Sequence, residues 1–194
     1  MIENKIINKG TGAGGANTIL NGLSFEIKTS IENKLLKNNF IKIILNKNNK
    51  YGYYFEFDNI IYLTQSGFKL YFKLKFNITV YKYPDEAFLI LNNNKYYLKI
   101  LEKKNQNVAG SVEDKLKTGA FNRKEYDKML NNKTDKIFII SYAFCISKYL
   151  QYKFESNQIK YNNMLEIMKE DNIKIFYGEN DNYYDVIYEW INMI

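Results

Sequence analysis

The sequence predicts an α/β fold with a mixed central β-sheet that helices cover on both faces. Helical and strand periodicities alternate along the chain. Residues 136–144 (KIFIISYAF) form a nearly continuous apolar run, which is typical of a strand buried on both faces. The 194 residues, 46% of them hydrophobic, suit a single domain with a packed core.

The first half of the chain opens with one expected helix and continues with strands. Apolar residues recur every three or four positions, which predicts an amphipathic helix over residues 20–37 that ends at Asn38-Asn39. The apolar positions of this helix are Leu20, Leu23, Ile27, Ile31 and Leu35. Residues 53–57 and 68–83 are rich in aromatic and β-branched side chains and are expected to be strands. The expected turns are Asp58-Asn59 and Ser66-Gly67.

A hairpin and a polar helix come next. Residues 87–91 and 95–103 are two strand-like runs on either side of Asn92-Asn93-Asn94, and asparagine favours a tight turn because it tolerates positive φ. Ser111 is expected to cap a helix over residues 111–131, with Asp114 as an acid of its first turn and Gly119 as the place where the helix can break. The remaining expected elements are helices over 146–154 and 158–170, a strand over 173–177 and a helix over 183–193.

The composition excludes several kinds of chemistry. The chain has no histidine and one cysteine. Ser-His-Asp and Cys-His catalysis, zinc sites built on histidine, Cys-rich metal sites and intrachain disulfides are therefore excluded. A metal held by this chain must be a hard cation on oxygen ligands, and Mg²⁺ is the one expected.

Charge and hydropathy indicate the compartment and the kind of partner. The net charge of +7 is compatible with a polyanion. No secretory signal and no apolar run of about 20 residues is visible. We therefore expect an intracellular protein without a membrane partner, in the cytoplasm of a prokaryote or of a virus-infected cell.

Two carboxylates are expected to face each other at the open end of the hairpin. A turn at residues 92–94 places Asp85 opposite Glu102, with Cβ atoms about 5 Å apart. The strand period of two puts Lys104 on the same face and turns Lys103 away. Carboxylates this close resist joint ionisation unless a cation lies between them. We therefore expect Asp85 and Glu102 to bind Mg²⁺, with Mn²⁺ as a substitute, and Lys104 to position or activate the attacking water.

The pattern of Pro84-Asp85 followed by Glu102-Lys103-Lys104 resembles the PD-(D/E)XK nuclease superfamily, and its type II restriction endonucleases above all. The resemblance implies a restriction-endonuclease-like core, ordered helix, three strands, helix, strand, with the motif on the central hairpin. It covers residues 15–145 of a single nuclease domain spanning 1–194, and residues 146–194 are then a C-terminal embellishment.

Further residues carry the same resemblance. Gln106 matches an extended ExKxQ form of the motif. Residues 12–18 with 22–26, and residues 106–116, are similar to stretches of viral and bacterial restriction enzymes. Superfamily members often place an additional acid on the first helix, and Glu26 is the matching candidate. Glu86 is the alternative to Asp85 if a bulge shifts the strand register.

Polar residues beyond the motif are candidates for DNA contacts, because Asn and Gln pair with adenine while Lys contacts guanine or phosphate. These candidates are Asn105, Gln106, Asn107, Ser111, Lys115 and Lys117, together with Gly14 and Asn17 of a Gly-rich loop. Residues 10–15 contain the letters GxGxxG, but they follow a poor strand and no GK[ST] comes after them. No nucleotide cofactor is therefore expected.

Together these observations predict a Mg²⁺-dependent, sequence-specific endonuclease of double-stranded DNA. A type II restriction enzyme acting as a homodimer is the first hypothesis, because two-fold symmetric DNA sites call for two-fold symmetric readers. The alternatives are a repair or structure-specific nuclease with the same site and a non-catalytic nucleic-acid-binding module.

Overall fold

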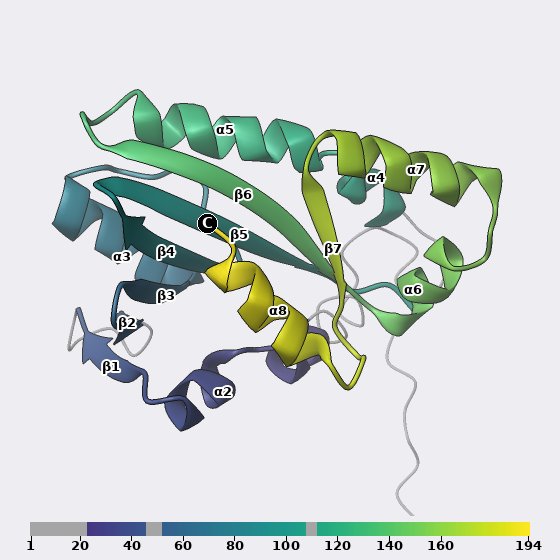
Figure 1. Ribbon diagram of the computed structural model, residues 1–194, viewed down its shortest axis with the longest axis horizontal. Coiled ribbons are helices and arrows are strands. Elements are labelled where there is room, and N and C mark those ends of the chain that lie inside the picture. The colour runs from purple at the N-terminus through teal and green to yellow at the C-terminus, as the bar shows by residue number, and fades with distance from the viewer. Residues whose placement is uncertain (1–22, 46–51, 108–111) are drawn as a thin grey trace, which may run out of the picture.

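The computed structural model describes residues 23–45, 52–107 and 112–194 and shows the expected α/β fold. A seven-stranded sheet runs in the order β1 to β7 (Figure 1). Strands β1 to β5 pair antiparallel, whereas β5–β6 and β6–β7 are parallel, so the sheet is mixed. The strands are β1 (Ile41–Ile44), β2 (Tyr53–Phe57), β3 (Ile60–Thr64), β4 (Glu86–Asn92), β5 (Lys95–Lys104), β6 (Ile137–Ile146) and β7 (Ile173–Tyr177).

Helices cover both faces of the sheet, and each face has its own apolar core. One core contains side chains of α3 to α7, and α5 lies along β6. The other core contains side chains of residues 23–28, α2 and α8. The helices are α2 (Glu32–Lys37), α3 (Gln65–Phe76), α4 (Val112–Leu116), α5 (Gly119–Asn131), α6 (Lys148–Phe154), α7 (Ile159–Glu170) and α8 (Tyr183–Asn192). No described helix has the length and apolar character needed to cross a membrane.

The hairpin of β4 and β5 has the predicted register. Asn92 pairs with Lys95, so the turn consists of two residues, Asn93 and Asn94. Both have positive φ, 48° and 60°, which is the backbone of a type I′ turn and matches the twist of the strands. The register is therefore fixed by a turn that asparagine can adopt at little cost.

One predicted strand is wrong: most of residues 68–83 forms helix α3, which is followed by segment 77–83 outside the sheet. The stretch from Phe68 to Phe76 has no β-branched residue, and its buried side chains, Phe68, Tyr71 and Phe72, recur at helical spacing. Thr64 caps the helix at its start and Asn77 ends it in the left-handed conformation.

The predicted turn at Ser66-Gly67 is also wrong, because both residues lie in the first turn of α3. Gly67 is required there for another reason. A Cβ on this residue would lie 2.3 Å from the carbonyl oxygen of Tyr53, so the glycine lets the helix approach β2.

The predicted helix over residues 20–37 is broken. Residues 23–28 are helical, residues 29–31 are not, and α2 begins at Glu32. Ile31 and Leu35 are buried as expected, but Leu23 and Ile27 are 52% and 66% exposed, so they do not belong to the buried stripe. The break frees the backbone N–H of Ile31, which donates to the buried carboxylate of Glu86 at 3.3 Å.

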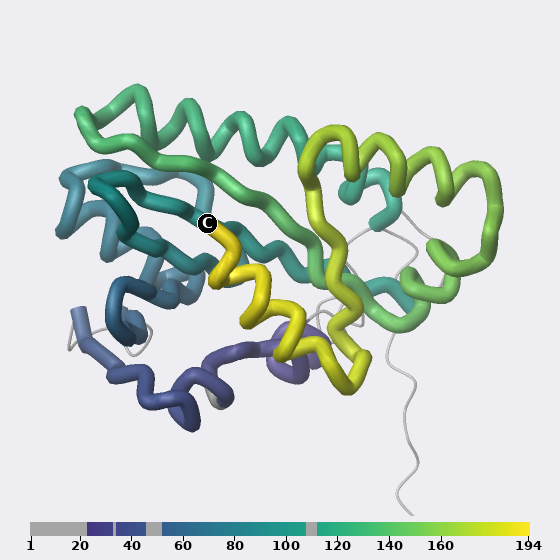
Figure 2. Tube along the Cα trace, in the orientation of Figure 1, coloured from purple at the N-terminus to yellow at the C-terminus, as the bar shows by residue number. Residues whose placement is uncertain are grey.

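The C-terminal third of the chain belongs to the same sheet, because β7 is its last strand. Residues 23–30 lie beside α8 (Figure 2), where the Tyr183 hydroxyl donates to the Thr29 carbonyl at 3.3 Å. Buried Lys99 of β5 anchors the other end of α8. Its Nζ donates to the carbonyl of Trp190 at 2.5 Å and to that of Met193.

The anchoring lysine generates a prediction about pH. Burial, with repulsion from Lys174, lowers the pKa of Lys99 from 10.5 to about 8. Between these pH values the unfolded chain binds the additional proton, so this group makes folding stability rise with pH. We expect the unfolding free energy of the wild type, minus that of Lys99→Met, to increase from pH 8 to pH 10.5 in urea titrations. A difference that stays flat or falls would contradict the assignment.

Candidate active site

Three charged side chains gather on one face of the sheet where the β4–β5 hairpin ends. In the ladder, Glu86 opposes Leu101. The preceding residue, Asp85, therefore lies beside Glu102. Strand alternation puts Lys104 on the same face as Glu102, as the sequence predicts. This face is the one that α5 covers, because its neighbouring strand residues pack in the same apolar core as α5.

The carboxylates of this cluster are held by short hydrogen bonds. The Lys104 ammonium donates to Oε2 of Glu102 at 2.9 Å. The backbone N–H of Lys103 donates to Oδ2 of Asp85 at 2.7 Å. The Glu102 and Lys104 side chains are only 15% and 21% exposed. The cluster is therefore largely removed from solvent. Each of the two hydrogen bonds, to Glu102 and to Asp85, uses one oxygen of the carboxylate.

Burial and mutual repulsion dominate the electrostatics. Burial raises the pKa of Glu102; the Lys104 ammonium opposes this rise and Asp85 adds to it. Burial also opposes the charge of Lys104, yet Glu102, Asp85 and Glu26 together raise the pKa of Lys104 above its usual value. Lys104 is therefore an ammonium at neutral pH. Its chemistry is to stabilise negative charge, and in this environment it does not serve as a base.

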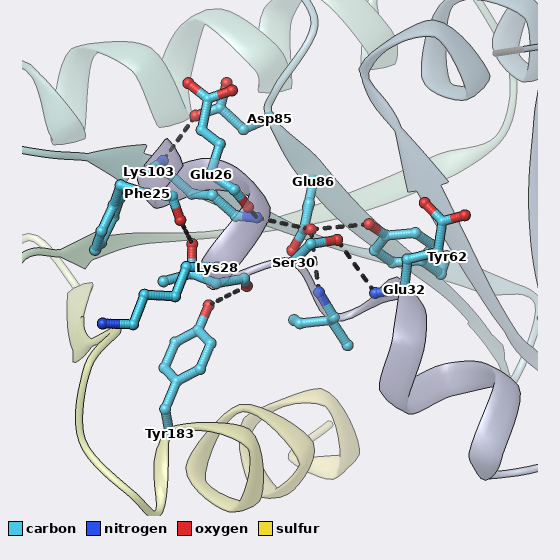
Figure 3. Close-up of polar contacts among 12 residues, drawn as sticks. Phe25, Glu26, Lys28, Ser30, Glu32, Tyr62, Asp85, Glu86, Lys103 and Tyr183 are labelled. Atoms are coloured by element: carbon cyan, nitrogen blue, oxygen red, sulfur yellow. Dashed lines mark hydrogen bonds and ion pairs between the residues drawn. The ribbon is translucent and has the colours of Figure 1, made fainter. Parts of the chain in front are cut away.

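Glu26 reaches the cluster from the helical segment 23–28, on the opposite side of the sheet. Figure 3 shows its carboxylate beside that of Asp85. Glu26 is exposed as a residue, but partial desolvation of its carboxyl group raises its pKa. The Asp85 charge raises it further, and the lysines at 103 and 104 oppose the rise. The structure thus brings the candidate acid of the first helix to the three motif residues.

Glu86 does not replace Asp85, because no bulge shifts the register. It points to the other face, where its side chain is 4% exposed and forms an ion pair of 2.8 Å with Lys103. The Tyr62 hydroxyl donates to the same carboxylate at 2.9 Å (Figure 3). Our sequence reasoning missed this pair, although strand alternation alone places Glu86 and Lys103 on a common face.

The carboxylates of the cluster are a donor set that a hydrated Mg²⁺ ion would fit. Among the described ranges, no three His, Cys, Asp or Glu side chains form a group that could hold a metal ion. Mg²⁺ is commonly bound through one or two carboxylates and several waters, which Asp85 and Glu102 would satisfy. The buried Tyr126 hydroxyl, whose pKa is raised by burial and by Glu102, has no hydrogen-bond partner in the described structure. A hydrated cation bound at Asp85 and Glu102 would supply water as a hydrogen-bond partner for this hydroxyl.

The candidate DNA contacts are not all equally accessible. Asn107, Lys115 and Lys117 are exposed, and Lys117 forms an ion pair of 2.7 Å with Asp114. Asn105 is half-buried. Gln106 is buried, and its backbone N–H and carbonyl both bond to the Ser147 hydroxyl, at 3.1 and 2.8 Å. Gln106 thus fixes the chain after β5 in this structure. The remaining candidates, Gly14, Asn17 and Ser111, lie outside the described residues.

Comparisons with protein-family models, with curated proteins and with solved structures find no match to this chain.

The electrostatic coupling within the cluster can be measured without any ligand. Because the Asp85 charge raises the pKa of both Glu26 and Glu102, we expect Asp85→Asn to lower both values. Carboxyl ¹³C NMR titration would measure the pKa values of Glu26 and Glu102. Glu179 is the internal control, since the pKa of its carboxyl is lowered by hydrogen bonds from Lys28 and the Lys148 backbone and should not move. Unchanged values for Glu26 and Glu102 would mean that the carboxylates do not interact.

Proposed function

We propose that this protein is a Mg²⁺-dependent endonuclease of double-stranded DNA with a PD-(D/E)XK site. The observation that carries the proposal is the convergence of Asp85, Glu102 and Lys104 on one face at the end of the hairpin. Two partly buried carboxylates that repel each other, with an adjoining ammonium, are the donor set for a divalent cation and for a phosphate bound to it.

The roles of the side chains follow from their charges. Asp85 and Glu102 hold the cation, which when bound supplies an acidified water and neutralises charge on the phosphate. Lys104 donates hydrogen bonds to the phosphate oxygens, where negative charge grows as the phosphorus is attacked. Glu26 adds a third carboxylate beside Asp85 and can accept a proton from the attacking water, because its raised pKa makes it a better base than an ordinary glutamate.

The surroundings of the site support the same substrate class. The hairpin has an antiparallel neighbour, β3, on one side and the parallel strand β6 on the other, reached through α4 and α5. A helical segment precedes these strands, and α4, α5 and β6 follow the hairpin, as the resemblance implies. The part between differs, because five strands, β1 to β5, and helix α3 stand where the resemblance implies three strands. A net charge of +7 favours a polyanionic substrate. Within this proposal the enzyme is an intracellular type II restriction endonuclease acting as a homodimer.

Nicking of a supercoiled plasmid tests the proposal. We expect cleavage that requires Mg²⁺ or Mn²⁺, and losses of at least about a hundredfold in Asp85→Asn and Glu102→Gln while DNA binding persists, because charge stabilisation at the phosphate is lost. Glu166→Gln, which removes an exposed acid of α7, is the matched control and should cleave normally.

The pattern of products separates the alternatives. Discrete fragments from mixed plasmid DNA support a restriction enzyme, and preference for branched substrates indicates a repair or structure-specific nuclease. Full activity in either site variant contradicts the assignment. Absence of cleavage, with binding that depends on Lys115 and Lys117 and not on Asp85, indicates a non-catalytic nucleic-acid-binding module.

A further inference from the structure

We propose that the side chain of Lys103, the middle residue of the Glu102-Lys103-Lys104 run, is a positioning group that with Glu86 holds the segment carrying the site carboxylate Glu26 in place. This inference rests on the proposed function and adds a role for the opposite face of the hairpin. Lys103 itself points away from the cation-binding face, so it acts only through other residues.

Lys103 contacts both carboxylate-bearing segments. Its backbone N–H donates to Oδ2 of Asp85 at 2.7 Å. Its side chain passes to the other side of the sheet, where Nζ donates to the backbone carbonyl of Glu26 at 3.0 Å (Figure 3). The backbone bond to Asp85 needs no particular side chain at position 103, whereas the bond to the Glu26 carbonyl needs the lysine.

Glu86 orients the lysine. The Lys103 and Glu86 side chains are only 3% and 4% exposed, and their atoms are 2.8 Å apart. Tyr62 and the backbone N–H of Ile31 donate to the same oxygen of Glu86, at 2.9 and 3.3 Å. A buried ion pair gives little stability relative to an apolar pair of similar size. The ion pair instead orients the Lys103 side chain, so that Nζ donates to the Glu26 carbonyl.

The segment carrying Glu26 needs such a bond because little else holds it. Among residues 23–28 only Phe25 is buried. Among the residues that the structure describes, the other bonds from the rest of the fold to this segment lie at or beyond its C-terminal end. Lys28 pairs with Glu179, and tyrosines of α8 donate to the carbonyls of Lys28, Thr29 and Ser30. Beside the packing of Phe25 in the apolar core, Lys103 therefore supplies a polar contact at Glu26 itself.

The informative variant is the charge-neutral pair Lys103→Met/Glu86→Gln, because removing the lysine alone would strand a buried carboxylate. Lys99→Met is the matched control. Lys99 is also buried, lies on the same face of β5 and donates to helix carbonyls, but those carbonyls belong to α8. Loss of a buried lysine is thus common to both variants, and loss of the bond to Glu26 is confined to the first.

Three readouts test the inference. Hydrogen exchange of the amides of residues 25–30, measured without metal, should be faster in the double variant than in the wild type or Lys99→Met. Its Mn²⁺ affinity should fall by about tenfold or more. Its kcat on plasmid DNA should fall by up to about a hundredfold with KM unchanged, because the reacting groups are misplaced while DNA contacts remain.

A cycle with Glu26→Gln shows whether the effect passes through Glu26. If it does, adding Glu26→Gln to the double variant costs little more in kcat or Mn²⁺ affinity than either change alone. Unchanged hydrogen exchange in the double variant would overturn the inference. So would a triple variant whose loss in kcat or Mn²⁺ affinity equals the product of the losses from the two separate changes. If the wild type neither binds Mn²⁺ nor cleaves DNA, the proposed function fails, and hydrogen exchange still decides whether Lys103 holds the segment.

Discussion

The two-residue turn at Asn93-Asn94 fixes the face of the sheet that each charged residue at the far end of the hairpin occupies. Both turn residues have positive φ, and the pairing of Asn92 with Lys95 follows from the turn. Side chains alternate along a strand, so a slip by one residue would move every side chain of the strand to the other face. The site thus depends on the backbone of two asparagines at the opposite end of the strands.

The same register gives the two faces of the hairpin opposite electrostatic conditions. On the face under α5, Asp85 and Glu102 share one lysine and a third acid lies nearby, so negative charge is in excess. On the other face, Glu86 and Lys103 form a balanced pair with further hydrogen bonds. A partly buried excess of negative charge calls for a cation, whereas a balanced buried pair can hold geometry without taking part in chemistry.

The sequence predicts the β4–β5 hairpin, the strands β6 and β7 and the C-terminal helices, because turn residues and apolar periodicity within each segment determine them. The site face followed from the asparagine turn and the strand period, which placed Asp85, Glu102 and Lys104 together. The aromatic content of α3 favours a strand, whereas the helical spacing of its buried aromatic residues and the absence of β-branched residues over 68–76 indicate the helix. The break at residues 29–31 involves the buried carboxylate of Glu86, fifty-five positions away, which no local pattern reveals. A DNA contact by the Gln106 side chain stays a prediction, and the structure shows its backbone bonded to the Ser147 hydroxyl.

The most direct measurement of the central claim is anomalous diffraction from crystals of the wild-type protein soaked in Mn²⁺. The account predicts an anomalous peak between the carboxylates of Asp85 and Glu102, within coordination distance of both, and its loss in crystals of Glu102→Gln. A peak at another group of side chains, or none at saturating Mn²⁺ in a crystal where the site is open to solvent, would contradict the claim that this hairpin binds the cation.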